Sequence, residues 1–192
     1  SEAEAADFDA PVTLGEPGGE PDVAADGGAA DPEAVVERAA EAERERVDAL
    51  LEKSEGVKHS DVRADVQQTM TENVNVFREK AGLEEALADL REARDAYRDV
   101  YVEDSSRTFN TDLIQTIETR NVLDIAEALT MGALARREFR GAHWRKERQE
   151  RDDENWLKHT LVSWNDGEPE LWYKPTILEG ENKTYEPKSR SY

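Results

Sequence analysis

The sequence predicts a mainly α-helical protein: an antiparallel three-helix bundle, spectrin-repeat-like, with an extra N-terminal helix and a short C-terminal β-hairpin extension. Between residues 32 and 140, apolar side chains recur at three- and four-residue spacing, as on the buried faces of helices. Short connections between these stretches favour antiparallel neighbours. After His159 the spacing becomes that of strands. We therefore divide the chain into an acidic disordered linker (1–31), a helical bundle (32–140), and an interface loop, hairpin and C-terminal tail (141–192).

The N-terminal part is predicted to be a flexible linker followed by a first helix. Residues 1–31 are mostly Ala, Gly, Pro, Asp and Glu, with too few large apolar side chains to form a core. Asp31, Pro32 and Glu33 supply an N-cap, a proline at the first helical position and an acidic first turn. This helix extends to about residue 51, with Val36, Ala40, Val47, Leu50 and Leu51 on one side.

Three further helices are predicted to form the bundle. Ser60 and Asp61 cap the second helix and Gly82 marks its end, and its apolar positions are Val62, Val66, Met70, Val74 and Phe77. The third helix carries Leu83, Leu87, Leu90, Ala93, Tyr97 and Tyr101. After a polar turn, the fourth helix runs to Arg136 and carries Leu113, Ile114, Ile117, Val122, Ile125, Leu129 and Ala133.

A hairpin is predicted after the bundle, because two apolar stretches flank Asn165-Asp166-Gly167, a sequence typical of tight turns. Three of the four tryptophans lie beyond Trp144. Aromatic residues gathered in a short extension are typical of a surface that a partner or another domain buries. The alternative is that the hairpin packs on its own bundle.

The charge and composition exclude several classes of protein. The chain has 25 Lys and Arg against 45 Asp and Glu, for a formal net charge of −20, which argues against binding nucleic acid or an anionic membrane. The acidity is dispersed along the chain, and we interpret it as halophilic adaptation. With no cysteine, the chain forms no disulfide and no Cys-ligated metal site. No apolar run is long enough for direct membrane insertion.

No sequence pattern predicts catalysis or cofactor binding by this chain. It lacks the glycine-rich patterns that cradle nucleotide phosphates and the HExxH spacing of zinc sites. His143, Asp152, Asp153 and His159 can be drawn as hard-metal ligands, but an Asp-Asp-Glu run after a loop is more typical of a helix N-terminus. We therefore assign no catalytic, cofactor-binding or metal-binding residue.

The most informative stretch is residues 136–160, which read RREFRGAHWRKERQERDDENWLKHT. Several Arg side chains beside Gly141 favour a surface that docks against an anionic or polar partner, since guanidinium groups suit carboxylate and phosphate. The alternative is a helix C-terminus whose cations complement the helix dipole, with a new helix beginning at Asp152.

This stretch resembles the RxESRGAHxR and RDDENWLKHT signatures of the succinate dehydrogenase and fumarate reductase flavoprotein subunits. Residues 70–78, the pair Ser105-Ser106 with Phe109-Asn110-Thr111, and the ending at 185–192 are similar to other parts of that family. The resemblance covers about residues 60–192. Phe139 stands where the family pattern has Ser.

The resemblance implies a C-terminal helical domain of a subunit that also has an FAD-binding and a capping domain. It implies an enzyme that oxidises succinate to fumarate and passes electrons from FAD to an iron–sulfur subunit and on to quinone. The implied location is cytoplasmic, at the inner face of the cell membrane through partner subunits. The implied contacts are with the FAD-binding and capping domains, and the candidate interface residues are Arg136, Glu138, Arg140, Gly141, His143, Arg145, Arg151, Asp152, Asp153, Trp156 and His159.

Two other hypotheses stay open at this point. The chain could be the corresponding domain of an L-aspartate oxidase, which shares the architecture, or a free-standing acidic helical interaction module. The DENWLKHT run and the terminal PKSRSY favour the dehydrogenase.

Overall fold

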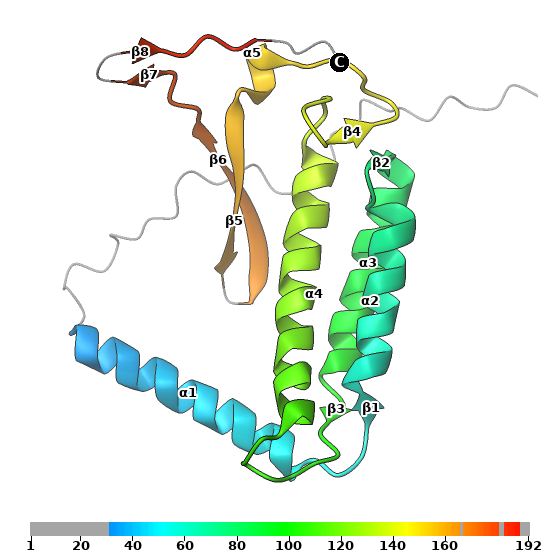
Figure 1. The fold of residues 1–192 in the computed structure, drawn as a ribbon, viewed down its shortest axis with the longest axis vertical. Coiled ribbons are helices and arrows are strands. Elements are labelled where there is room, and N and C mark those ends of the chain that lie inside the picture. The colour runs from blue at the N-terminus through cyan, green and yellow to red at the C-terminus, as the bar shows by residue number, and fades with distance from the viewer. Residues whose placement is uncertain (1–30, 166, 181–182, 189–192) are drawn as a thin grey trace, which may run out of the picture.

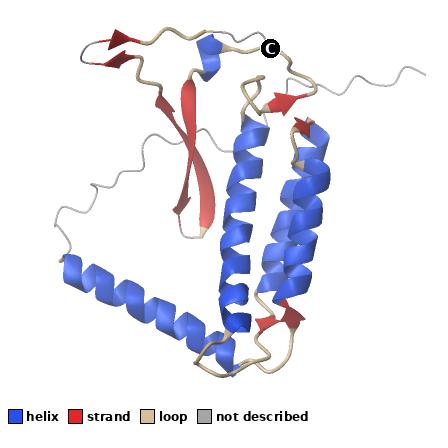
Figure 2. Cartoon of the chain, viewed as in Figure 1, coloured by secondary structure: helices blue, strands red, loops and turns tan. Residues whose placement is uncertain are grey.

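The structure, a computed structural model, describes residues 31–165, 167–180 and 183–188 and confirms a mainly helical fold. The long helices are α1 (Pro32–Glu52), α2 (His59–Asn73), α3 (Lys80–Tyr97) and α4 (Thr111–Ala135), and a short α5 (Asp153–Trp156) follows. Helices α2, α3 and α4 pack as an antiparallel bundle, and α1 leaves it at an angle (Figure 1). Figure 2 shows short strands at the two ends of the bundle, a longer pair of strands beside α4 and a further short pair beyond that longer pair.

Short parallel strand pairs close the bundle at both ends. At one end β1 (Val57–Lys58) pairs with β3 (Val100–Tyr101), and at the other end β2 (Phe77–Arg78) pairs with β4 (Trp144–Arg145). The longer strands β5 (Lys158–Asn165) and β6 (Glu168–Pro175) form the predicted hairpin. A small pair, β7 (Glu179–Gly180) and β8 (Lys183–Thr184), follows it.

The hairpin packs on its own bundle. Leu171 of β6 is buried in the same apolar cluster as Leu87 of α3 and Met131 of α4, and Val162 of β5 packs against that cluster. The Arg94 guanidinium lies 5.0 Å from the centre of the Trp164 ring, which ties α3 to β5. A second apolar cluster near the other end of the bundle holds Val62, Val66, Leu90, Ala93, Val100, Leu123 and Ala126.

The buried face of α4 differs from the predicted one. Ile114, Ile125 and Leu129 are 55%, 67% and 43% exposed, whereas the buried face includes Thr116, Thr119 and Thr130 beside Leu123, Ala126 and Leu134. Each of these threonine hydroxyls donates a hydrogen bond to the carbonyl four residues earlier, at 2.7–2.9 Å. With its hydroxyl paired in this way, threonine presents a methyl group to the core. Helix α4 therefore has two apolar faces, and only one is inside the bundle.

Several predicted helix boundaries were wrong. Helix α2 ends at Asn73, so Phe77 lies on β2 and not on a helix, and Gly82 lies in the first turn of α3. Arg78 explains the break, because its Nε donates to the carbonyls of Val74 (3.0 Å) and Asn75 (2.8 Å) and holds a turn there. Likewise α2 begins at His59 without a side-chain cap from Ser60 or Asp61, and Tyr101 lies on β3.

The start of α1 agrees with its prediction. Asp31 is the N-cap, and its carboxylate accepts a hydrogen bond from the Glu33 amide at 3.2 Å. Of the predicted apolar side of α1 only Leu50 is buried, since the helix touches the bundle near its C-terminal end. The predicted linker, except Asp31, lies outside the described residues. None of the described helices combines the length and apolar character needed to cross a membrane.

Candidate functional site

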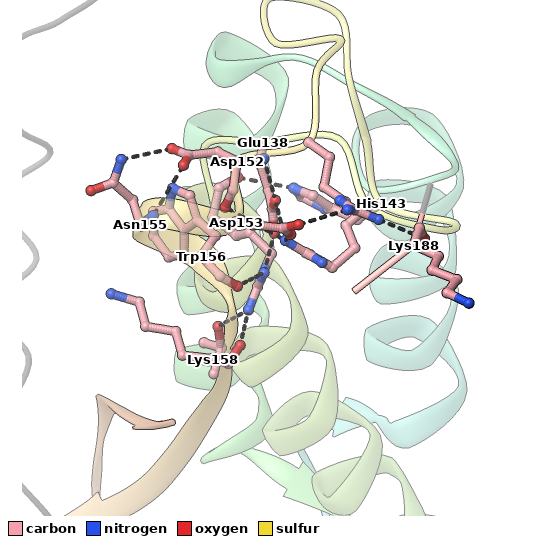
Figure 3. A network of polar contacts seen from close by, with 12 residues as sticks. Glu138, His143, Asp152, Asp153, Asn155, Trp156, Lys158 and Lys188 are labelled. Carbon is pink, nitrogen blue, oxygen red and sulfur yellow. Dashed lines mark hydrogen bonds and ion pairs between the residues drawn. The ribbon is translucent and has the colours of Figure 1, made fainter. Parts of the chain in front are cut away.

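A buried carboxylate organises the segment that follows α4. Glu138 is fully buried, and its Oε1 accepts from Arg140 Nε at 2.7 Å while its Oε2 accepts from Arg140 Nη2 at 2.9 Å (Figure 3). Arg136 forms a further ion pair with Glu138, and the Asp152 amide donates to Oε2 at 3.0 Å. The carboxylate is thus paired with two cations and one backbone amide, which offsets the cost of burying its charge.

Arg136 and Arg140 connect this carboxylate to the chain beyond it. Arg136 donates from Nη1 to the Trp156 carbonyl at 3.0 Å and from Nη2 to the Lys158 carbonyl. Arg140 Nη2 also donates to Asp153 Oδ1 at 2.7 Å. The end of α4, helix α5 and the start of β5 are therefore held by one set of polar contacts. We call it the Glu138 network: Arg136, Glu138, Arg140, Arg151, Asp152, Asp153 and Trp156, the last through its carbonyl group.

Helix α5 begins where the sequence predicts, at Asp152. The Asp152 carboxylate accepts from the Asn155 amide at 3.0 Å and from the Asn155 side chain at 2.9 Å, and these bonds lower its pKa. The pKa of Asp153 is also lowered, chiefly by its hydrogen bond from Arg140. Arg151 donates to Asp153 Oδ2 at 2.6 Å and to the Lys188 carbonyl at 2.8 Å, so the C-terminal tail joins the network.

The last turn of α4 is capped by side chains from β4 and the loop before it. Arg145 is 4% exposed, and its Nη1 donates to the carbonyls of Ala133 and Leu134, both at 3.1 Å. His143 Nε2 lies 2.9 Å from the Arg136 carbonyl. These contacts satisfy carbonyl groups that a helix end leaves unpaired. The helix C-terminus with nearby cations, one of the two predicted alternatives, is therefore present, and Arg145 and His143 contact its last carbonyl groups.

His143 is held as a neutral imidazole. Arg78 Nη1 lies 3.0 Å from His143 Nδ1, and because a guanidinium only donates, Nδ1 is the acceptor and Nε2 carries the proton. Burial lowers the pKa of His143, and the positive charges of Arg78 and Arg145 lower it further. His143 therefore links the turn between α2 and α3 to the end of α4.

Gly141 forms a tight turn. The backbones of Arg140 and His143 exchange two hydrogen bonds at 3.0 and 3.1 Å, and Gly141 between them has a φ of 60°. A Cβ added to Gly141 would meet nothing within 4 Å in this chain. The glycine is thus required by the left-handed backbone and not by close approach of another part of this chain.

The predicted interface residues gather around the C-terminal end of α4, with one exception. His159 lies exposed on β5, paired through its backbone with Lys174, and takes no place in the Glu138 network. It lines a shallow depression together with Arg136, Arg140 and Trp156. The Arg140 guanidinium already donates to the carboxylates of Glu138 and Asp153 within this chain, through Nε and Nη2.

An aromatic cluster beside the network was missed by the sequence reasoning. The Trp144 ring lies 4.9 Å from Phe77 and 5.5 Å from Phe139, in edge-to-face arrangements. Phe77 is 63% exposed and Trp144 36% exposed. Phe77 was assigned to a helix, and only its long-range pairing with Trp144 brings the cluster together. Phe139, which stands where the family pattern noted above has Ser, packs against Trp144.

The polar groups of this region hold segments of the chain in place. The donors and acceptors of the Glu138 network are paired with one another, which rigidifies the segment from the end of α4 to β5. Among the described residues, no group of three or more His, Asp or Glu side chains is arranged to hold a metal ion.

Comparison with known proteins identifies the family. Residues 63–192 match the family described as "Fumarate reductase flavoprotein C-term". A succinate dehydrogenase flavoprotein subunit from Oryza sativa is 41% identical over 137 residues, and a fumarate reductase flavoprotein subunit from Haemophilus influenzae is 36% identical over 134 residues. Both matches cover 69% of this chain, which spans 22% of each relative.

A solved structure of E. coli quinol fumarate reductase has the same fold. Its TM-score is 0.73 at 32% identity, and the match covers 85% of this chain and 27% of that chain. The family match and these relatives support the resemblance drawn from the motifs at 136–160 over the other two hypotheses. The chain belongs to the family of succinate dehydrogenase and fumarate reductase flavoprotein subunits, as the C-terminal domain of such a subunit.

Proposed function

We propose that this domain packs against the FAD-binding and capping domains of its flavoprotein through the C-terminal end of α4, and that it contributes no catalytic group. The observation that carries the proposal is the aromatic cluster of Phe77, Phe139 and Trp144, of which Phe77 and Trp144 are exposed, next to a paired polar network. An exposed apolar cluster on a strongly charged protein is typical of an interface. Residues 141–192 form the interface part of the domain in this proposal.

The activity proposed for the parent subunit follows from its relatives. These are named as succinate dehydrogenase and fumarate reductase flavoprotein subunits. We propose that the parent interconverts succinate and fumarate with FAD, and that an iron–sulfur subunit carries electrons between FAD and quinone. In this proposal the complex lies at the inner face of the cell membrane, with this domain on the cytoplasmic side.

The residues of this chain do not fit an FAD site. The cations at the end of α4 are already paired with carboxylates, and the N-terminus of α5 is capped by its own Asp152. Gly141 does not line a phosphate-binding loop, because a Cβ added there would meet no atom of this chain within 4 Å. We therefore propose that the upstream domains hold FAD and that the isolated chain retains none. Flavin absorbance that stays with the isolated chain through gel filtration would contradict this.

The docking proposal is tested by comparing two contexts. Arg140→Ala is a poor test, because it breaks bonds inside the chain and should destabilise the domain wherever it is. Phe77→Ser is better, since an exposed side chain should cost the isolated chain at most about 1 kcal/mol. In the full-length flavoprotein the same change should reduce flavin retention and succinate oxidation.

One outcome would contradict docking through the end of α4. If Phe77→Ser has the same small effect on melting in both contexts, and the full-length protein keeps its flavin and activity, the end of α4 is not the docking surface. Ile177→Ser serves as a control, because Ile177 is also exposed, at 78%, but takes no part in the aromatic cluster.

A further inference from the structure

The chain has two methionines, and their surroundings differ. Met131 on α4 is 5% exposed, whereas Met70, in the last turn of α2, is only partly buried. Oxidation of a sulfur-containing side chain in a folded protein depends on how far the side chain is exposed to the oxidant. Met70 is therefore the methionine that an oxidant in solution can reach without unfolding of the bundle.

Met70 connects the two apolar clusters of the bundle. It packs against the cluster that holds Leu87 and Met131, and also against the cluster that holds Val66 and Leu90. A polar group placed on its sulfur would therefore face apolar side chains of both clusters. Because a polar group that is buried without a hydrogen bond costs stability, a change at this sulfur should affect the packing of both.

A buried hydroxyl group lies beside the Met70 sulfur. Thr130 on α4 is fully buried, and its Oγ1 lies 3.7 Å from Met70 Sδ and donates to the Ala126 carbonyl at 2.7 Å. A thioether is a weak acceptor, so the carbonyl takes the single hydroxyl proton while Met70 is reduced. The same carbonyl is the helical acceptor of the Thr130 amide. The hydroxyl can therefore turn to a stronger acceptor at the sulfur without leaving the carbonyl unpaired.

We propose that Met70 is a site of reversible oxidation to methionine sulfoxide, at which the Thr130 hydroxyl binds the sulfoxide oxygen. Hydrogen peroxide is the oxidant. A lone pair of Met70 Sδ attacks one peroxide oxygen, the O–O bond breaks as the S–O bond forms, and the other oxygen leaves as water after proton transfer. The sulfur loses two electrons and the peroxide gains them. In the reverse step, a methionine sulfoxide reductase uses a dithiol: the sulfoxide oxygen leaves as water, and the two thiols become a disulfide.

Treatment of the chain with dilute hydrogen peroxide tests which methionine is oxidised. Mass spectrometry of the peptides follows sulfoxide formation at Met70 and Met131 over time. We expect Met70 to be oxidised about tenfold faster than Met131 or more, because the buried sulfur reacts only when the fold opens, and we expect equal rates in urea. Equal rates in the folded chain, or faster oxidation of Met131, would overturn the proposal. This comparison uses the unchanged chain, so it does not depend on the folding of any variant.

Thr130→Val tests the role of the hydroxyl, because valine keeps the shape of the side chain and removes the donor. We expect oxidation to lower the melting temperature of Thr130→Val at least about twice as much as that of the unchanged chain, since the sulfoxide oxygen is then buried without a partner. Thr119→Val is the matched control: Thr119 is fully buried on the same helix and donates to the Gln115 carbonyl at 2.8 Å. Thr130→Ser keeps the hydroxyl and should respond to oxidation as the unchanged chain does.

Three outcomes would refute the proposal. Equal effects of oxidation on Thr130→Val and Thr119→Val would show that the Thr130 hydroxyl does not bind the sulfoxide. A decrease in melting temperature that persists in Met70→Leu would assign the effect to Met131. A sulfoxide at Met70 that a methionine sulfoxide reductase with a dithiol does not remove would show that the oxidation is not reversible, whereas we expect the original mass and melting temperature to return.

Discussion

Replacing Glu138 by Gln tests whether the buried carboxylate organises the segment after α4. The substitution keeps the size of the side chain and removes its charge. An amide group then faces Arg140 Nη2 and the Asp152 amide, which are both donors and now lie 2.9 and 3.0 Å from the carboxylate oxygen. Arg136 and Arg140 would be left without their central anion.

The size of the loss follows from these contacts. A hydrogen bond to a charged group contributes about 1.5–3 kcal/mol, and breaking a buried ion pair costs about 3–5 kcal/mol. Because the Arg136 and Arg140 side chains are 14% and 29% exposed, water compensates part of the loss. We expect a decrease of about 3 kcal/mol in the free energy of unfolding, or roughly 6–12 °C in melting temperature for a domain of this size.

Thermal and urea unfolding of the isolated chain, followed by circular dichroism and tryptophan fluorescence, measure this loss. Glu150→Gln is the matched control, because Glu150 is an exposed glutamate in the same loop and should change stability by less than about 0.5 kcal/mol. If the two variants lose the same small amount, the Glu138 network does not stabilise the fold.

Three further predictions concern pH, salt and one turn. The pKa of His143 is lowered in the folded chain, so as pH falls the unfolded chain takes up a proton at this residue before the folded chain does. The contribution of neutral His143 to stability is therefore present above its ordinary pKa of 6.5 and is lost as pH falls below that value. Between about pH 7 and pH 5, the melting temperature should fall less for His143→Gln than for the unchanged chain. With a net charge of −20, the melting temperature should rise from dilute to molar KCl, and a flat profile would count against charge repulsion. Gly141→Ala should cost about 1 kcal/mol in urea unfolding because of its φ of 60°, whereas Ala142→Gly at the neighbouring position should cost less.

Elements that depend on local sequence were predictable. Asp31 with Pro32 begins α1, Asp152 begins α5, and the turn at Asn165 joins β5 to β6, because caps and turns use residues close in sequence. The buried face of α4 was not predictable, because the helix has apolar residues on two sides and periodicity alone does not show which side packs in the bundle. Buried threonines added to the error, since their paired hydroxyls are invisible in a hydropathy pattern.

The residues of the candidate site were named from motifs, but their roles depend on contacts between distant segments. Glu138 was named as a candidate contact with another domain, whereas it is buried among cations and an amide of its own chain. Arg78 was not singled out at all, because it meets His143 only through a contact across 65 positions of sequence. Whether these residues contact another domain stays a prediction.

The pairing of β2 with β4 has a consequence for the order of folding. It joins Phe77 to Trp144 across the whole of α3 and α4, so its loop-closure entropy is offset only after those helices have packed. The strand pair and the charged cluster behind it should therefore form late. In native-state hydrogen exchange, amides around Arg140 and in α5 should open with a lower free energy than those in the middle of α3 and α4. The order of this segment would then report that the helices of the bundle have packed.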